Sequence, residues 1–264
     1  MQPYFHLFGL EVPAYGVMMV LGGLAAVLLV LTRRKQYPVG RVDAVNLLAL
    51  CTVGALAGAK ALYVLTVLPD IFSHWDRVLA NPMGAVSYAL GGLVFYGGVL
   101  GALGVGAWYI RKYRLDFPAS ADLFAPAIPA AQAIGRVGCF LGGCCYGVEA
   151  AWGFTAHASL APDANGVPRV PVQLIESVCD LLICLALLWY ERRHPKRGRV
   201  FAMYLLLYAP VRFVLEFFRG DALRGIAMGV STSQWISVLL FGVGLVMFQG
   251  RRQRTADSGQ RTGG

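Results

Sequence analysis

Long apolar runs separated by short polar segments make up most of this chain. Each run is about 20 residues long, enough for a helix to cross roughly 30 Å of hydrocarbon. The runs are Tyr15–Leu31, Val42–Leu65, Leu93–Ile110, Ala119–Phe140, Pro171–Tyr190, Val200–Leu215 and Ser231–Phe248. The pattern predicts an all-α, polytopic integral membrane protein with about seven transmembrane helices. Because Pro126, Pro129 and Gly135 interrupt the fourth run, a broken helix is expected there, facing protein or a wet cavity.

Composition supports the same class. Hydrophobic residues make up 57% of the chain and charged residues only 14%, which argues against a water-soluble domain. We assign residues 1–250 to one transmembrane domain, whose longest loop outside the cell spans about 148–170. The tail 251–264 is polar, lacks apolar periodicity and is predicted to be disordered.

The basic residues predict the orientation of the helices. Most of the 23 Lys and Arg residues fall on one side if the runs alternate in direction. These clusters are Arg33, Arg34, Lys35 and Arg41; Arg111, Lys112 and Arg114; Arg192, Arg193, Lys196, Arg197 and Arg199; and Arg251, Arg252, Arg254 and Arg261. Since cytoplasmic loops carry the excess of Lys and Arg, the N-terminus is expected outside and the C-terminus in the cytoplasm. Anionic lipid at the inner face accounts for the net charge of +9, so no nucleic-acid partner is expected.

Four other cations lie in or at the edge of apolar segments: Lys60, Arg136, Arg212 and Arg219. An arginine in mid-membrane costs about 2.5–3.5 kcal/mol on insertion scales, so it is normally paired or bound to an anion. Arg212 and Glu216 stand four residues apart on one helix face, with Arg219 farther along the same stripe. A purely structural ion pair is one interpretation of that stripe.

An anionic ligand is the other interpretation. One acid cannot neutralise several arginines, so adding Arg136 to the stripe favours a bound anion. Guanidinium groups bind phosphate with two parallel hydrogen bonds. We therefore expect a phospholipid head group near the outer leaflet.

The segment AIGRVGCFLGGCCYG, residues 133–147, resembles the signature of the bacterial prolipoprotein diacylglyceryl transferase family. The resemblance extends over roughly 15–248, with the motifs in the same order and a seven-crossing topology. The supporting segments are AYGVMMVLG (14–22), GGLVFYGGVLGA (91–102), VPVQLIES (170–177), VRFVLEFFRGD (211–221) and GVSTSQWIS (229–237).

The resemblance implies an enzyme of the bacterial plasma (inner) membrane. Such an enzyme transfers the diacylglyceryl group of phosphatidylglycerol to the lipobox cysteine thiol of a prolipoprotein signal peptide and releases glycerol phosphate, the first step of lipoprotein maturation. It needs no cofactor; both substrates are expected to enter a cavity from membrane lipid. A non-catalytic phospholipid-binding or transporting protein with the same pocket is the alternative.

Site residues carried over from the family fall on several helices. Arg136 and Arg212 match family arginines and are expected to hold the phosphate, with Arg219 beside them as a further binding residue. Glu216 matches the family glutamate that would orient Arg212, and Tyr15 matches a tyrosine that would offer its hydroxyl to the head group.

Glycines contribute to the predicted binding site as well. Gly147 matches a family glycine that permits a turn or a close approach of lipid. Gly97 and Gly98 match the paired glycines of the third helix. Tight helix packing is the alternative interpretation for these glycines.

The sequence departs from the family pattern at four positions. Tyr96 stands where many members have histidine, the obvious base for the thiol, and Cys139, Gly142 and Cys144 replace two asparagines and a glutamate. Tyrosine is a poorer base than imidazole at neutral pH. Tyr96 is therefore expected to donate a hydrogen bond to the phosphate, while nearby arginines favour the thiolate of the substrate.

The clustered cysteines leave three interpretations open. Cys139, Cys144 and Cys145 could hold zinc together with His157, form a disulfide on the oxidising outer face, or pack as small polarizable side chains. Packing of these small side chains is the preferred interpretation, and no metal is expected.

Overall fold

The computed structural model describes residues 2–7, 9–220, 226–227 and 230–260 of this chain, most of them in helices. Two units with dense internal contacts divide the chain: residues 1–37 together with 118–264, and residues 38–117. The first, called here the large unit, contains the signature segment; the second is called the small unit.

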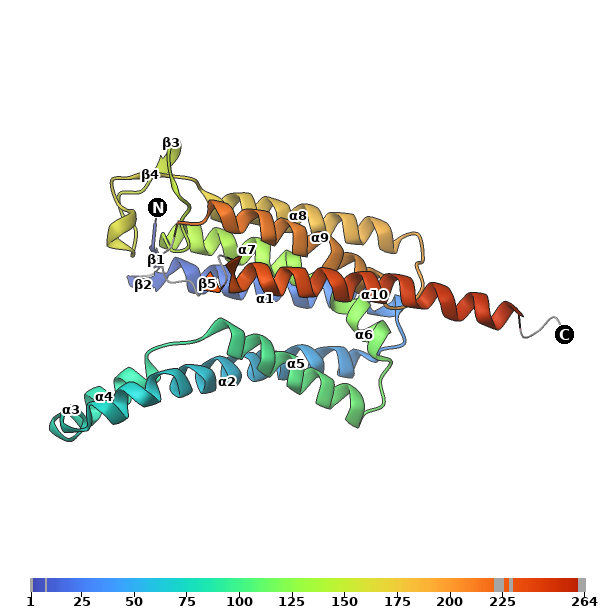
Figure 1. The fold of residues 1–264 in the computed structure, drawn as a ribbon, viewed down its shortest axis with the longest axis horizontal. Helices are drawn as coiled ribbons and strands as arrows, with labels where there is room; N and C mark the ends of the chain where they lie inside the picture. The colour runs from blue at the N-terminus through green and yellow to red at the C-terminus, as the bar shows by residue number, and fades with distance from the viewer. Residues whose placement is uncertain (1, 8, 221–225, 228–229, 261–264) are drawn as a thin grey trace. The chain divides into compact units, whose positions relative to one another are not determined.

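The large unit is a bundle of five long helices (Figure 1). Adjacent pairs in the bundle are α1 with α7, α7 with α8, α8 with α9, and α9 with α10. The helices are α1 (Ala14–Arg33), α6 (Phe117–Phe124), α7 (Ala127–Gly142), α8 (Val172–Glu191), α9 (Arg199–Leu215) and α10 (Thr232–Gln260), with short 3₁₀ helices η1 (Arg34–Gln36), η2 (Pro162–Ala164) and η3 (Glu216–Phe218).

Small antiparallel strand pairs, which the apolar pattern did not predict, gather at one end of this bundle (Figure 1). The strands are β1 (Tyr4–Leu7), β2 (Leu10–Pro13), β3 (Glu149–Thr155), β4 (Pro168–Arg169), β5 (Ile226–Ala227) and β6 (Val230–Ser231). The pair β3–β4 occupies the segment predicted as the longest outside loop. The basic loop between α8 and α9 lies at the opposite end of α8.

The small unit contains α2 (Arg41–Ser73), α3 (Trp75–Ala80), α4 (Pro82–Leu90) and α5 (Phe95–Lys112). Glycines bring α2 and α5 together, because a Cβ atom at Gly58 would meet the backbone of Gly97 and Gly101. Such close backbone contact is typical of helices that pack within a membrane. The ammonium of Lys60 donates to the carbonyls of Leu90 and Gly92. This intramembrane lysine therefore stabilises the turn before α5.

The membrane-spanning pattern predicted from the sequence is confirmed with one refinement. Among the described residues, six helices are long and apolar enough to cross a membrane, and a bent pair raises the number to seven. The single spans are Ala14–Gln36, Arg41–Ser73, Phe117–Gly142, Val172–Glu191, Arg199–Phe218 and Thr232–Gln249. The predicted third crossing corresponds to α5. This helix is long and apolar enough to span a membrane only together with α4, and the two are bent by 65°.

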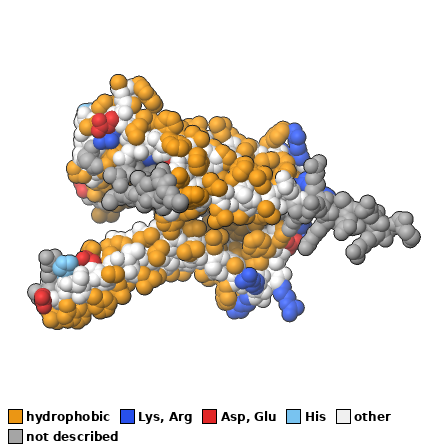
Figure 2. All heavy atoms as spheres, in the orientation of Figure 1, with side chains coloured by type: hydrophobic (Ala, Val, Ile, Leu, Met, Phe, Trp, Pro, Cys, Tyr) orange, Lys and Arg blue, Asp and Glu red, His pale blue; other side chains and the backbone are white. Residues whose placement is uncertain are grey.

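Surface composition agrees with a membrane environment. Hydrophobic side chains cover most of the helical surface in the view of Figure 2, while Lys and Arg gather near helix ends. On α1, Leu24 and Leu28 leave more than half of their surface exposed. Since a soluble domain rarely exposes such continuous apolar area, these faces suit lipid contact.

The fourth crossing is interrupted at Pro126 as predicted, whereas Pro129 and Gly135 lie inside the continuous helix α7. Pro126 lies between α6 and α7 and caps the second of these helices. The two helices together form one span, and α7 packs against α1, where a Cβ atom at Gly22 would meet the carbonyl of Ala131. Gly143 ends α7 in a left-handed conformation, with φ of 77°, which suits glycine.

At the basic end of the bundle, Arg33 corrects one expectation. It does not face lipid head groups but is buried, and its Nε and Nη2 donate to the Glu191 carboxylate at 2.7 and 2.5 Å. Nη1 donates to the carbonyl of Leu123 at 2.7 Å, and Nη2 also reaches the carbonyl of Asp122 at 3.3 Å. The Tyr37 hydroxyl donates to the same carboxylate. Arg33 thus joins the ends of α1, α6 and α8.

The C-terminal tail was predicted to be disordered over 251–264. The helix α10 extends to Gln260 and so includes the first part of that segment, whereas residues 261–264 lie outside the described chain. Disorder of the tail stays a prediction.

Candidate active site

Arg212 and Glu216 form the ion pair that their spacing predicts. Arg212 lies in the last turn of α9, and Glu216 begins η3 directly after it. The Arg212 Nη2 atom lies 2.7 Å from Glu216 Oε2, and both side chains are largely buried. The two opposite charges are therefore in direct contact, and the role of Glu216 in orienting Arg212 for a substrate stays a prediction.

Arg136 also has a carboxylate partner, which corrects the expectation that it is balanced only by an anion. Its Nη2 atom lies 2.8 Å from Oε1 of Glu176, a buried residue of α8. About a quarter of the Arg136 side chain, 23%, stays exposed. The arginine is thus held at one edge and accessible elsewhere.

Glu176 and Asp180 are functional candidates that the sequence analysis missed. They stand four residues apart on α8, and both are buried. Asp180 interacts electrostatically with Glu176, Arg136 and Arg212, which places both arginines in one cluster around the two acids. The sequence could have identified them, because two acids four residues apart in an apolar segment are rare unless they face a polar interior.

The guanidinium of Arg212 is incompletely satisfied. Its Nη1 atom is buried and has no hydrogen-bond partner among the described residues. Buried polar atoms in proteins are nearly always paired, and each exception calls for an explanation such as a ligand. The free donor edge of Arg212 is therefore where an anion oxygen would complete the site.

Tyr15 lies at the start of α1, beside α7. A Cβ atom at Gly138 would contact the backbone and ring of Tyr15, so the two helices pack closely here. Tyr15 interacts electrostatically with Arg136 and with the three clustered cysteines. The structure thus brings this predicted head-group tyrosine to the same end of the bundle as Arg136.

Gly147 and Arg219 join the loop after α7 to the chain after η3. They form an isolated antiparallel bridge, and the N–H of Gly147 donates to the carbonyl of Val170 at 3.1 Å. A Cβ atom at Gly147 would meet the carbonyls of Val170 and Phe218. Close approach of backbones, rather than a left-handed turn, is what requires glycine at this position.

The sulfur atoms of Cys139, Cys144 and Cys145 lie within 4.8 Å of one another. Thiol hydrogen bonds from Cys139 and Cys144, and then the charges of Arg219 and Arg136, lower the pKa of the Cys145 thiol against the opposing effect of burial. The three cysteines are free thiols. Their sulfur atoms are close enough together for one metal ion to bind all three, while the packing interpretation stays a prediction.

Hydrogen bonds stabilise the loop that brings these three thiols together. Gly143 and Cys145 both have positive φ, 77° and 58°, so the chain folds back onto the end of α7. The Gln173 side-chain amide donates to the Cys144 carbonyl at 2.7 Å, and the Ser159 hydroxyl donates to the Gly143 carbonyl at 2.9 Å. His157, the fourth zinc ligand considered above, is exposed and does not belong to the sulfur cluster.

Three predicted site residues lie in the small unit, at the start of α5. Tyr96 is partly exposed and its ring meets that of Phe95 edge to face at 5.9 Å between centroids. A Cβ atom at Gly97 would meet the carbonyl of Gly58, and one at Gly98 would approach α2 as well. Both glycines thus have a packing role, and their contact with substrate stays a prediction.

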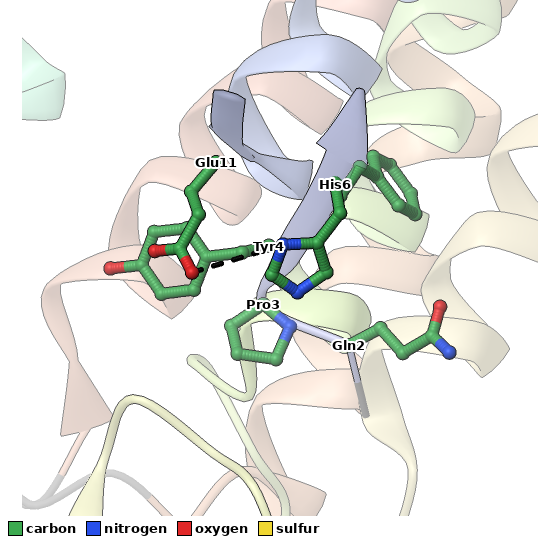
Figure 3. Close-up of a pocket in the computed structure, with 6 residues that line it drawn as sticks. Gln2, Pro3, Tyr4, His6 and Glu11 are labelled. Atoms are coloured by element: carbon green, nitrogen blue, oxygen red, sulfur yellow. Dashed lines mark ion pairs between the residues drawn. The ribbon is translucent and has the colours of Figure 1, made fainter. Parts of the chain in front are cut away.

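A hollow of about 380 Å³ lies at the N-terminal strand pair (Figure 3). It is lined by Gln2, Pro3, Tyr4, Phe5, His6 and Glu11. His6 Nδ1 and Glu11 Oε1 lie 3.8 Å apart, and both side chains are exposed. Because none of the predicted site residues lines this hollow, the cavity expected beside Arg136 stays a prediction.

Comparisons with known proteins identify the family of this chain. The family model for prolipoprotein diacylglyceryl transferase matches residues 2–249. A phosphatidylglycerol–prolipoprotein diacylglyceryl transferase of Clostridium tetani is 34% identical over 92% of this chain and 95% of its own length. A second enzyme of that name, from Clostridium perfringens, is 36% identical over 92% of both chains, and one from Geobacter sulfurreducens is 33% identical over the same shares. The chain therefore belongs to the prolipoprotein diacylglyceryl transferase family.

Proposed function

We propose that this protein transfers the diacylglyceryl group of phosphatidylglycerol to the lipobox cysteine thiol of prolipoprotein signal peptides. The names of the relatives, which specify phosphatidylglycerol and prolipoprotein, support this substrate pair. The apolar helices support a multi-pass membrane protein, and we assign it to the bacterial plasma (inner) membrane. Both substrates would then reach the site from lipid.

The phosphate of the donor lipid is held by Arg136 and Arg212. Glu176 and Glu216 each bind one edge of an arginine and leave the remaining donors for the phosphate oxygens. Two guanidinium groups stabilise the negative charge that develops on the departing phosphate oxygen, which lowers the barrier to attack by sulfur. The observation that carries this proposal is the buried Arg212 Nη1 atom, which lacks a partner in the described chain.

The remaining predicted residues position the two substrates. Tyr15 offers its hydroxyl to the head group, and Arg219 adds positive charge at the same end of the bundle. Gly147 permits the close backbone approach of the segments at Val170 and Phe218. Tyr96 donates a hydrogen bond to the phosphate, with Gly97 and Gly98 permitting the approach of lipid at α5.

The reaction is tested with the purified full chain in vesicles of phosphatidylglycerol and a synthetic signal peptide that carries one lipobox cysteine. We expect a diacylglyceryl thioether on the peptide by mass spectrometry and release of glycerol phosphate. A peptide with serine in place of the lipobox cysteine is the control. Saturable binding of phosphatidylglycerol without any transfer would instead support the non-catalytic alternative.

Orientation is tested by labelling with a membrane-impermeant thiol reagent. Single cysteines at Ala158, before α8, and at Arg193, after it, are introduced into a variant whose native cysteines are serine. We expect Ala158→Cys to react in intact cells and Arg193→Cys only after permeabilisation, because one crossing separates the two positions. Equal labelling at both positions contradicts the assigned topology.

A further inference from the structure

We propose that Cys139, Cys144 and Cys145 bind a thiolate-preferring divalent cation of the zinc class, whose fourth coordination position accepts the thiol of the protein substrate. This inference rests on the proposed function, because it names how the incoming thiol loses its proton. The metal site can nevertheless be tested without any measurement of transfer.

The spacing of the three sulfurs suits a metal. They lie within 4.8 Å of one another. Zinc–sulfur bonds of about 2.3 Å in a tetrahedral site place sulfur atoms roughly 3.8 Å apart, so a small inward movement completes the coordination. Three protein ligands with one open position are the pattern of catalytic zinc, whereas structural zinc normally has four protein ligands.

The three cysteines differ in how far they are exposed to solvent. Cys139 is buried in the last turn of α7, Cys145 is partly buried, and Cys144 is exposed. A metal and an incoming thiol would therefore reach the cluster from the side of Cys144. The hydrogen bonds from Gln173 and Ser159 to this turn hold the ligands in place, as outer-shell partners do in metal sites.

Nearby cations balance the charge of the site. Three thiolates around a divalent ion carry one net negative charge, and a bound substrate thiolate adds a second. The charges of Arg136 and Arg219 both act on Cys145, and Arg136 also acts on Cys139. Two guanidinium groups therefore offset the negative charge that metal and substrate would bring into this largely buried site.

Arg136 also connects the thiol cluster to the phosphate site. It pairs with Glu176 and also interacts electrostatically with Cys139 and Cys145. A thiolate bound at the metal would thus lie in the same electrostatic neighbourhood as the phosphate that Arg136 holds. Such placement turns attack of sulfur on the glycerol carbon into a reaction between neighbouring groups.

The chemical step balances without an oxidant or a reductant. The substrate thiol replaces a water on the metal and gives its proton to bulk water, because a coordinated thiol is deprotonated. The sulfur lone pair forms the bond to the terminal glycerol carbon as the bond from that carbon to the phosphate oxygen breaks. The electron pair stays on the departing glycerol phosphate, and the thioether product, a weaker ligand than thiolate, leaves the metal.

The metal site is tested first by binding. The purified full chain, stripped with a chelator under reducing conditions, is titrated with Co²⁺ and then Zn²⁺ in detergent. We expect one Co²⁺ per chain with cobalt–thiolate absorption, displaced by Zn²⁺. Cys139→Ser, Cys144→Ser and Cys145→Ser should each weaken binding by more than the roughly 10–100-fold that loss of an outer-shell partner costs.

Controls separate loss of a ligand from loss of the fold. Cys179→Ser, on α8 and outside the cluster, should bind Co²⁺ like the wild type. Cys144→His keeps a ligand at that position and should retain binding with a changed spectrum. Weak binding that is equal in the wild type and the serine variants overturns the metal site, as does a disulfide between two of the three cysteines in protein that binds no metal.

Transfer assays then test the role of the metal. We expect chelation to abolish transfer by the wild type and Zn²⁺ to restore it, with no restoration in Cys139→Ser. Transfer that persists in metal-free protein overturns the inference and leaves the proposed function intact. One bound metal per chain without transfer under any condition keeps the site and overturns its catalytic role together with the proposed function.

Discussion

Two buried arginine–glutamate pairs at opposite ends of the large unit differ in how completely their arginines are bonded. Arg33, at the basic end, uses Nε and Nη2 on Glu191, and its Nη atoms also donate to backbone carbonyls at the end of α6. Arg212, at the end that carries the strand pairs, forms an ion pair with Glu216, and its Nη1 atom lacks a hydrogen-bond partner in the described chain.

Under the proposed function, this difference separates a structural arginine, Arg33, from one that binds a ligand, Arg212. A fully bonded guanidinium closes the last turn of a helix and has no donor left for a ligand. An incompletely bonded one in a buried setting is costly unless a ligand completes it. Burial and pairing with glutamate are common to both, so neither property alone identifies the active site.

Removal of the partner should cost most at the structural pair. We expect Glu191→Ala to lower the free energy of unfolding by roughly 3–5 kcal/mol, because it leaves the buried Arg33 charge uncompensated. Thermal unfolding in detergent measures this loss. Transfer per folded molecule should stay near that of the wild type, and a selective loss of transfer with unchanged stability would contradict the structural assignment of Arg33.

Substitution of the binding arginine should show the opposite pattern. We expect Arg212→Lys to reduce transfer by about 100-fold, or roughly 2.7 kcal/mol of transition-state stabilisation, because a point charge loses the two-pronged grip on phosphate. Its unfolding temperature should change little. The matched control is Arg192→Lys, an exposed position in the loop after α8, which should transfer normally. Arg136→Lys should resemble Arg212→Lys.

A carboxylate that orients a binding arginine should matter less than the arginine itself. We expect Glu176→Gln to reduce transfer by roughly 10-fold, since the amide keeps one hydrogen bond to Arg136 but loses the charge. The loss should lie mainly in kcat if Glu176 positions the phosphate for reaction rather than for binding. A rise in KM alone, with kcat unchanged, would show that the pair contributes only to lipid affinity.

The smallest effect is expected in the small unit. Tyr96→Phe should retain partial activity, within about 10-fold of the wild type, with little change in the pH profile, because Tyr96 donates one hydrogen bond and takes no proton. Steady-state transfer across pH measures this. Complete inactivity in a folded variant that still binds lipid, or a gain of activity in Tyr96→His, would identify Tyr96 as the proton acceptor instead.

Much of the membrane topology was predictable because it depends on local transfer energies. Whether about 20 residues enter hydrocarbon is decided by their summed hydrophobicity, so each run of the sequence reappears as helix, although α2 and α10 continue well beyond their runs. The ion pair of Arg212 and Glu216 was predictable for a similar reason, since the helix itself brings residues four apart together. The bend between α4 and α5 was not, because the predicted apolar run, Leu93–Ile110, covers α5 but not α4.

Contacts between helices could not be predicted from the pattern of apolar and polar residues. Arg136 meets Glu176 only because α7 packs beside α8, and Arg33 meets Glu191 only because α1, α6 and α8 end at the same level. The three cysteines converge because Gly143 and Cys145 turn the chain back with positive φ. Sequence by itself determined which residues are apolar enough to enter the membrane and which cations stand out there. Only the tertiary structure decided which of those cations are fully bonded and which keep a donor free, because hydrogen-bond partners come from segments that are distant along the chain.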